Sequence, residues 1–198
     1  LYHRSDRVWK VHTDQAAGRR RASGCGRGIC CGNHVGKLRH SRVPFYRRNI
    51  GVVFQDFRLL PKMTVFENIA FALEVLALDK VTIRRRVREI LELVSLQDKA
   101  KSFPDQLSGG QQQRATIARA IANHPKVLIA DEPTGNLDPE KSMEIIELLD
   151  KINKVEGTTI VMVTHDSTLV NTYKKRTIAL EDGFIVADIA KGGYIHHD

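Results

Sequence analysis

Short apolar runs alternate with longer amphipathic segments along most of this chain. The runs at residues 50–54, 127–130 and 158–163 are rich in β-branched residues, which is typical of buried strands. Apolar residues at helical spacing predict helices at residues 64–78, 82–94, 110–123, 139–155 and 167–173, and Asp182-Gly183 predicts a terminal hairpin of residues 176–181 and 184–186. This alternation predicts an α/β fold with a largely parallel sheet and helices on both of its faces.

Polar residues at the expected helix ends support these boundaries. Thr64 and Glu67 form a Thr-x-x-Glu capping box, and Asp138 precedes Pro139, as an N-cap precedes a proline in the first turn. In the helix at 82–94 the apolar residues share one face. The arginines between them are therefore expected mostly to face water: Arg84, Arg85, Arg86 and Arg88.

The first 42 residues do not share this pattern. They lack hydrophobic periodicity and hold 10 Lys or Arg against 2 Asp or Glu. Residues 43–198 hold 21 of each sign, so the whole net charge of +8 lies in the first fifth of the chain. A nucleic-acid surface is therefore not predicted for residues 43–198. The first segment also holds all three cysteines, which fit neither a disulfide scaffold nor a zinc pattern.

The overall composition is that of an ordinary globular domain, with 42% hydrophobic and 27% charged residues. No apolar run approaches the roughly 20 residues that span a bilayer, and the N-terminus shows no signal-peptide pattern. We expect a cytosolic protein that reaches a membrane only through a partner.

A candidate phosphate site opens the helix expected at 110–123. It is the run Leu107-Ser108-Gly109-Gly110-Gln111. The two glycines let backbone N–H groups approach an anion closely, the serine adds a hydroxyl donor, and the positive end of the helix faces the same point. A Ser-Gly-Gly run alone is more often a flexible turn, but the Gln-Gln-Gln-Arg and the helix that follow it make that interpretation poor.

A second group of polar residues follows the expected strands. Asp131 and Glu132 come directly after the run at 127–130, where one carboxylate can hold Mg²⁺ and the other can polarise water as a general base. Gln55 and His165 follow the other two runs. Alone, either residue would carry no functional prediction.

Together these residues resemble the motifs of ABC ATPases. They match the signature at 107–111, the Walker B motif at 127–132, the D-loop at 135–138, the Q-loop glutamine Gln55 and the switch histidine His165. The resemblance covers residues 43–198. It implies a P-loop-type α/β domain over that range, with a helical subdomain at about residues 62–105, that binds ATP and Mg²⁺.

The resemblance also implies roles for single residues. Asp131 would hold Mg²⁺ directly or through water, and Gln55 would sense the metal and the attacking water and couple to a membrane partner. Glu132 would act as general base, and neutral His165 would hydrogen-bond the γ-phosphate.

Two copies of the chain would sandwich two ATP molecules head to tail. Each site would then receive the signature residues of the opposite protomer: Ser108, Gly109, Gly110 and Gln111. Asp138 would cross the interface between the protomers, with a plain helix N-cap as the alternative interpretation.

The text of residues 47–61 is similar to the cell-division ATPases of the FtsE type. That resemblance implies a peripheral homodimer on the cytoplasmic face of the cell membrane, an integral partner of the FtsX type, and control of septal cell-wall hydrolysis. Phe57, Leu59 and Leu60 form a candidate docking surface for a partner helix, with core packing as the alternative. Lipoprotein-release and macrolide-export ATPases share much of this sequence and are alternative assignments. DNA-repair ATPases with the same signature are excluded, because they carry long coiled-coil insertions and this sequence shows none.

The sequence contains no Gly-x-x-x-x-Gly-Lys-Ser/Thr phosphate loop ahead of Gln55, although ABC ATPases need one. Read one base out of frame, the codons of residues 4–19 permit Gly-Pro-Thr-Gly-Ser-Gly-Lys-Ser-Thr-Leu-Ile-Lys-Leu-Leu-Ala-Gly. We hypothesise that residues 1 to about 31 are a frameshifted translation and that the normal frame returns before Val43. The chain as written is then expected to bind ATP poorly. The alternative is a natural divergent tail on a non-hydrolysing regulatory module.

Overall fold

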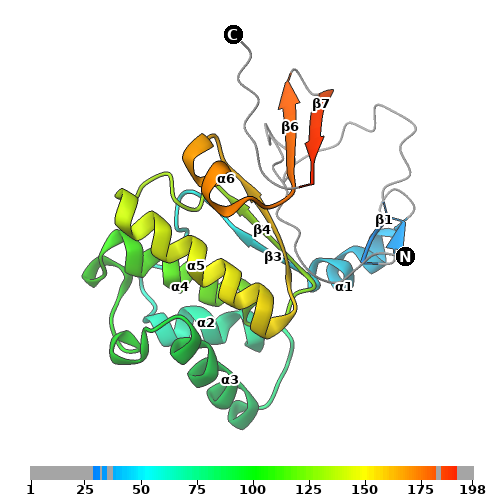
Figure 1. The fold of residues 1–198 in the computed structure, drawn as a ribbon. Helices are drawn as coiled ribbons and strands as arrows, with labels where there is room; N and C mark the ends of the chain where they lie inside the picture. The colour runs from blue at the N-terminus through cyan, green and yellow to red at the C-terminus, as the bar shows by residue number, and fades with distance from the viewer. Residues whose placement is uncertain (1–28, 32, 35–37, 182–183, 191–198) are drawn as a thin grey trace.

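The structure is a computed structural model that describes residues 29–31, 33–34, 38–181 and 184–190. Its centre is a parallel sheet in the order β3-β4-β5, formed by Ile50–Val53, Val127–Asp131 and Thr159–Val163 (Figure 1). The register pairs Val53 with Ala130, and Asp131 with Val163. The three predicted strands are confirmed, and their carboxyl ends lie at one edge of the sheet. The hypothesis about residues 1–31 falls almost entirely outside the described residues.

Three helices cover one face of this sheet. They are α4 (Gly109–Ile121), α5 (Pro139–Glu156) and α6 (Ser167–Tyr173). Residues of the strands that face these helices are buried, including Leu128, Ala130 and Ile160, whereas Val52 on the opposite face is 36% exposed. Glycine is required at Gly51 because a Cβ there would collide with the carbonyl oxygen of Ala120 in α4.

The prediction of helices on both faces is therefore wrong for the described part of the chain. The strands follow one another in a single direction across the sheet. Right-handed crossovers between strands added in one direction place every connecting helix on the same face. Helices on both faces require the strand order to reverse at a switch point, and no such reversal occurs among β3, β4 and β5.

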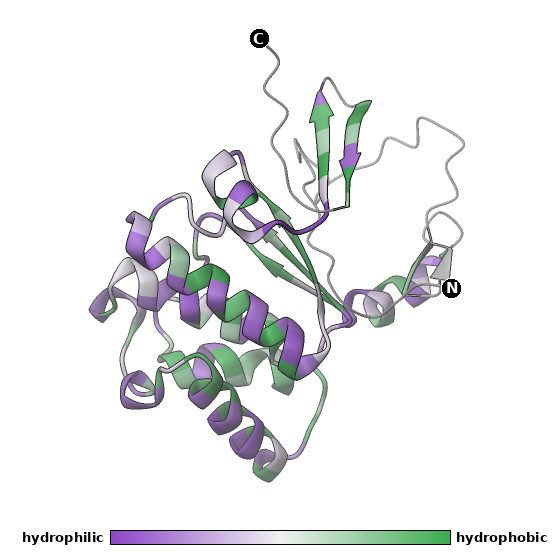
Figure 2. Ribbon diagram, viewed as in Figure 1, coloured by the Kyte–Doolittle hydropathy of each residue, from purple (hydrophilic) through white to green (hydrophobic). Residues whose placement is uncertain are grey.

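Two further helices, α2 (Val65–Glu74) and α3 (Lys80–Leu93), pack together beside α4 (Figure 1). The predicted capping box forms, since the Glu67 amide donates to the Thr64 hydroxyl and the Thr64 amide donates to the Glu67 carboxylate. α2 ends earlier than predicted, and α3 begins earlier because Asp79 accepts hydrogen bonds from two amides of its first turn. Figure 2 shows α3 largely hydrophilic on its outer side and the central strands hydrophobic.

Arg86 contradicts the sequence prediction, because it is buried rather than facing water. It is 9% exposed and donates to both carboxylate oxygens of Glu156, each at 3.1 Å. It also donates to the carbonyl oxygens of Ile121 and Ala122, each at 3.2 Å. Arg86 lies at the border of the apolar face of α3, so the ends of α4 and α5 decide whether that position receives water or protein.

The remaining elements are short. The terminal hairpin is confirmed as β6 (Thr177–Glu181) with β7 (Phe184–Ile189), and β7 runs three residues beyond the prediction. Elements not predicted are listed here with their bounds: β1 (Ile29–Cys30), β2 (Asn33–His34), α1 (Val43–Arg47) and 3-10 turns η2 (His40–Arg42), η3 (Gln97–Lys99) and η4 (Pro104–Gln106). In the described part of the chain, no helix is both long and apolar enough to cross a membrane.

Candidate nucleotide site

The carboxyl edge of the parallel sheet gathers four of the predicted site residues. Asp131 is the last residue of β4 and Glu132 follows it, while Gln55 and His165 each lie two residues beyond the end of a neighbouring strand. Open parallel sheets bind ligands at this edge, because backbone and side-chain polar groups are exposed there. The fold therefore places two carboxylates, an amide and an imidazole at the same edge of the sheet.

Glu132 and His165 form a direct pair. The Glu132 carboxylate accepts the backbone N–H of His165 at 3.1 Å and lies 2.7 Å from its Nδ1. This contact requires the proton on Nδ1, which leaves Nε2 of the neutral ring as a hydrogen-bond acceptor. The Glu132 side chain is 19% exposed and that of His165 is 83% exposed. The base candidate is thus fixed in place, and the histidine ring faces solvent.

The backbone of Glu132 is unusual and is held by the sheet. Its φ angle is 44°, in the left-handed region that costs a non-glycine residue roughly 1–3 kcal/mol. Its N–H donates to the carbonyl oxygen of Val163 at 3.0 Å, which extends the β4–β5 pairing by one residue. The turn therefore directs the Glu132 side chain toward His165 immediately after the strand ends.

The D-loop lies between Gln55 and the start of α5. Asn136 donates from its side-chain amide to the carbonyl oxygen of Gln55 at 3.3 Å. A Cβ on Gly135 would come 3.1 Å from the Gln55 side-chain nitrogen, so the glycine lets this loop approach the glutamine. The sequence placed Asn136 in the D-loop motif but gave it no role of its own, because an asparagine in a loop gives no signal that would reveal this contact.

The signature turn forms the N-terminus of α4, as predicted. Ser108 is the N-cap and forms a capping box with Gln111. A Cβ on Gly109 would lie 3.4 Å from Leu137 of the D-loop, and one on Gly110 would lie 3.1 Å from the Lys141 side chain of α5. The turn is thus packed against the D-loop and α5 of its own protomer.

Asp138 caps α5, which confirms the alternative interpretation of this residue. Its carboxylate accepts the backbone N–H of Lys141 at 2.9 Å and pairs with the Lys141 ammonium. These hydrogen bonds and the lysine charge hold the pKa of Asp138 below its ordinary value. The role of Asp138 across a dimer interface stays a prediction.

The three docking candidates, Phe57, Leu59 and Leu60, are all partly exposed. Leu59 packs against the main hydrophobic core, so core packing accounts for part of its role. A Cβ built on Gly109 of the signature turn would lie 4.0 Å from the ring of Phe57, which is an ordinary van der Waals distance. The segment after Gln55 therefore connects the sheet edge to the signature turn.

The donor set fits a nucleotide-bound Mg²⁺. The described residues contain no group of three or more His, Cys, Asp or Glu that could enclose a metal by themselves. Mg²⁺ is usually held by one or two carboxylates together with phosphate oxygens and water, so a complete protein cage is not expected. Asp131, with the amide oxygen of Gln55 nearby on the same edge, supplies oxygen ligands of the required kind.

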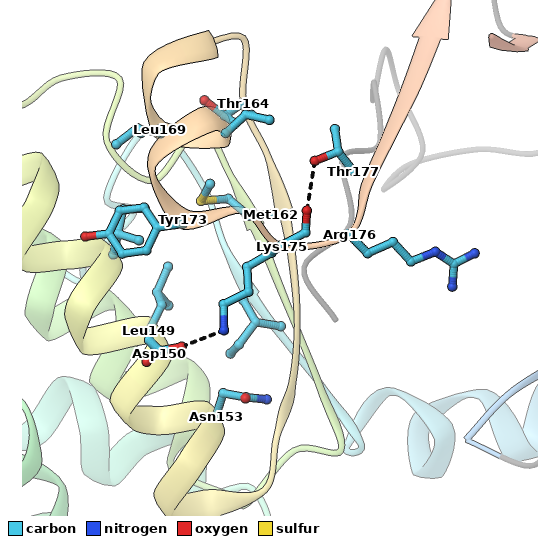
Figure 3. Close-up of a pocket in the computed structure, with 13 residues that line it drawn as sticks. Leu149, Asp150, Asn153, Met162, Thr164, Leu169, Tyr173, Lys175, Arg176 and Thr177 are labelled. Atoms are coloured by element: carbon cyan, nitrogen blue, oxygen red, sulfur yellow. Dashed lines mark hydrogen bonds and ion pairs between the residues drawn. The ribbon is translucent and has the colours of Figure 1, made fainter. Parts of the chain in front are cut away.

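A separate pocket lies between α5, β5 and α6 (Figure 3). It is lined mainly by apolar side chains such as Leu149, Met162 and Leu169, and Asp150 pairs with Lys175 at 3.1 Å beside it. Because its lining includes none of the four residues at the sheet edge, it is not the candidate nucleotide site.

Comparison with known proteins finds an ABC transporter family and several cell-division ATP-binding proteins as relatives. The family described as ABC transporter matches residues 28–135. The cell division ATP-binding protein FtsE of Bacillus subtilis is 58% identical over 168 residues, which cover 84% of this chain and 73% of that protein. FtsE of Mycobacterium tuberculosis is 53% identical over 161 residues, covering 81% and 70%, and that of Escherichia coli K12 is 48% identical over 154 residues, covering 78% and 69%.

Solved structures agree with this assignment. The dimeric ATP-binding cassette MJ0796 bound to ADP and Pi is similar with a TM-score of 0.71 at 37% identity, covering 83% of this chain and 73% of that one. CbiO1 of Clostridium perfringens, part of the ABC transporter complex cbiONQ, is similar with a TM-score of 0.76 at 30% identity, covering 81% and 64%. The motifs, the fold and these relatives agree, and the chain belongs to the ABC transporter family of ATP-binding, ATP-hydrolysing subunits.

Proposed function

We propose that this chain is the ATPase subunit of an FtsE-type cell-division complex and works with an integral membrane partner of the FtsX type. The observation that carries the proposal is the set of Gln55, Asp131, Glu132 and His165 on one sheet edge, in a chain 48–58% identical to FtsE proteins. The complex would lie peripherally on the cytoplasmic face of the cell membrane and regulate septal cell-wall hydrolysis.

In this proposal each residue at the sheet edge has one task. Asp131 and Gln55 hold Mg²⁺, which would neutralise charge on the phosphate oxygens of ATP. Glu132 accepts a proton from the attacking water. His165 is oriented by its Nδ1 contact with Glu132 at 2.7 Å, so that Nε2 of the neutral ring would accept a hydrogen bond from the attacking water; in this tautomer it cannot donate to the γ-phosphate.

The signature residues would act on the ATP of the opposite protomer. Ser108 and the backbone N–H groups of Gly109 and Gly110 stand at the positive end of a 13-residue helix, where an anion is stabilised. MJ0796 has been described as a dimer with ADP and Pi, which supports a homodimer here. Asp138, next to the signature turn through Lys141, would then lie near the interface.

The direct test is Glu132→Gln in a chain whose N-terminal frame has been repaired. Removing the base while keeping the shape should trap ATP and produce a stable dimer by light scattering, whereas the repaired parent should hydrolyse ATP and return to monomer. Ser108→Arg in the Glu132→Gln background is the control, because it blocks the opposite site without touching the metal ligand. Failure of Glu132→Gln to retain ATP or dimerise would refute the two-protomer site.

The sequence as written supports a second candidate, a regulatory module that docks without turnover. The observation that favours it is the lack of a phosphate-loop string before Gln55. We expect ATP affinity at least about a hundredfold weaker for the chain as written than for the repaired chain, because the main phosphate cradle is missing. Micromolar ATP binding by the chain as written would contradict this expectation of weak binding. DNA sequencing of codons 1–45 tests that hypothesis independently.

The docking surface is tested through the partner. The double variant Phe57→Asp with Leu60→Asp should abolish co-purification with an FtsX-type subunit from membranes, because it places charge in an apolar contact. Phe184→Asp is a matched control on the exposed terminal hairpin, where Phe184 is 74% exposed. Retained co-purification of the double variant, with normal folding by circular dichroism, would refute the docking surface.

A further inference from the structure

Two polar side chains of α4 contact the backbone of the docking segment, which we define as residues 56–62. The Thr116 hydroxyl lies 2.9 Å from the carbonyl oxygen of Phe57. Arg119 donates from Nη1 to the carbonyl oxygen of Arg58 at 2.7 Å. Because Ser108 caps the same helix, one rigid element joins the signature turn to the docking segment.

The Thr116 hydroxyl has two acceptors at equal distance. It lies 2.9 Å from the Phe57 carbonyl oxygen and also 2.9 Å from the carbonyl oxygen of Gln112, one turn earlier in α4. A threonine hydroxyl carries a single proton, so it cannot donate fully to both. Thr116 is 1% exposed, and a buried donor without a partner is costly. The contact with Gln112 lets the Phe57 carbonyl oxygen move away from Thr116 without leaving the hydroxyl as a buried donor that has no acceptor.

The docking segment is bent at Arg58, and contacts at both sides hold the bend. Arg58 has a φ angle of 49°, which is strained for a residue with a side chain. Its guanidinium lies over the ring of Phe54 at 3.9 Å from the centroid, and Arg119 binds its carbonyl oxygen. Release of Arg119 would therefore also permit this strain to relax.

The docking segment is fixed more firmly from Leu60 onward. Asn68 is fully buried in α2, accepts the N–H of Leu60 at 2.8 Å and places its amide 3.0–3.2 Å from the carbonyl oxygens of Leu60, Met63 and Thr64. These four contacts to one buried side chain hold the backbone from Leu60 to Thr64 together, whereas the contacts from α4 to Phe57 and Arg58 come from one side chain each. Movement of the docking segment is therefore confined to residues before Leu60, next to Gln55.

We propose that Thr116 and Arg119 are positioning residues that couple the signature turn to the docking segment, and that the two acceptors of Thr116 make this coupling reversible. The proposal rests on the proposed function for its biological direction. Movement of α4 when the signature turn binds nucleotide would shift Phe57 and Arg58, and partner binding at the docking segment would bias α4 equally, because coupling free energies are reciprocal.

Hydrogen exchange of the full chain, measured by mass spectrometry, tests the contacts without requiring ATP. Thr116→Val keeps the shape of the side chain and removes the hydroxyl, and should accelerate exchange in peptides covering residues 56–60 about fivefold, the change expected for one lost hydrogen bond. Thr116→Ser should restore the parental rate. Thr172→Val is the matched control, because Thr172 makes only the equivalent bond within its own helix, to Thr168 at 2.8 Å.

Limited trypsin digestion tests Arg119, since trypsin cleaves after the exposed Arg58. Arg119→Met should accelerate cleavage at that bond several-fold, and Arg85→Met, which removes an exposed arginine of α3, should not. Unchanged exchange and cleavage in Thr116→Val and Arg119→Met would overturn the proposal. Faster exchange spread equally over α4 and β3 would also overturn it, because these side chains would then stabilise the domain rather than the segment.

The coupling itself is tested in the frame-repaired chain with its membrane partner. Thr116→Val should leave ATP affinity within about twofold of the parent and remove most of the change in ATPase rate caused by the partner, while Thr116→Ser retains it. Full partner response in Thr116→Val would refute coupling through this hydroxyl. If the repaired parent neither binds ATP nor captures the partner, the proposed function fails, whereas the exchange and digestion results still decide the contacts.

Discussion

The buried Arg86 offers the sharpest test of how the helical part of this domain is held to the core. Arg86 projects from α3 and binds the last carboxylate of α5 together with two carbonyl groups at the end of α4. The side chains of Arg86 and Glu156 are each 10% exposed. Arg86→Met keeps much of the aliphatic volume but removes every one of these hydrogen bonds.

The magnitude follows from what the substitution leaves behind. Removing one partner of a buried ion pair costs about 3–5 kcal/mol, because the other charge loses its compensation. Glu156 retains a contact of 2.7 Å to His124, whose side chain is 64% exposed, and this contact reduces the loss. We therefore expect Arg86→Met to lower the free energy of unfolding by about 3 kcal/mol, a large share of the roughly 5–15 kcal/mol typical of a domain.

Urea denaturation of the full chain, followed by far-ultraviolet circular dichroism, measures this loss. Arg85→Met is the control on the same helix. Arg85 pairs with Glu89 at 3.9 Å with side chains 74% and 54% exposed, so its removal should cost no more than about 0.5 kcal/mol. The double variant Arg86→Met with Glu156→Gln should be more stable than Arg86→Met alone, because no buried charge is then left unpaired.

Two results would refute this reasoning. A loss below about 1 kcal/mol for Arg86→Met would mean that water or His124 compensates Glu156 fully. Equal effects of Arg86→Met and Arg85→Met would mean that burial of Arg86 contributes nothing specific. The double variant separates these cases, since full compensation by His124 predicts that Glu156→Gln gives no recovery.

Three further predictions concern other parts of the fold. Gly51→Ala should lower the free energy of unfolding by about 1–3 kcal/mol in urea denaturation, because the new methyl meets a backbone carbonyl of α4 that cannot move aside; full stability would contradict the close packing of α4 on β3. Thr64→Ala should cost about 1 kcal/mol in the same assay by removing the capping box of α2, and Thr64→Ser should recover most of it. Burial disfavours the charged form of Glu156, but hydrogen bonds and charges from Arg86 and His124 outweigh it and hold the pKa of Glu156 below the usual 4.5. The stabilisation that this carboxylate gives is therefore present above pH 4.5 and is lost as the pH falls through the lower folded-state pKa. Glu156→Gln should flatten the dependence of stability on pH in that acidic range, and an unchanged pH profile would contradict the assignment.

Much of the local structure could be read from residue patterns. The capping box at Thr64 and the Asp138 cap of α5 depend on contacts between residues close in sequence, and the three strands are visible as short runs rich in β-branched residues; all were predicted correctly. The candidate site residues were found through the resemblance to the motifs of ABC ATPases, several of which lie just beyond strand ends. The pairing of Glu132 with His165 was not predicted, because the two residues are separated by 33 positions and meet only through the register of β4 and β5.

The sequence alone determined the three central strands, the main helices and the terminal hairpin, and the residue types that could bind phosphate, metal and water. Tertiary structure decided the rest. It buried Arg86, placed α4, α5 and α6 on one face of the sheet, and set Thr116 between two carbonyl groups. The physical reason is that burial and hydrogen-bond partners across long sequence separations depend on how elements pack, whereas caps and periodicity act within a few residues of the chain.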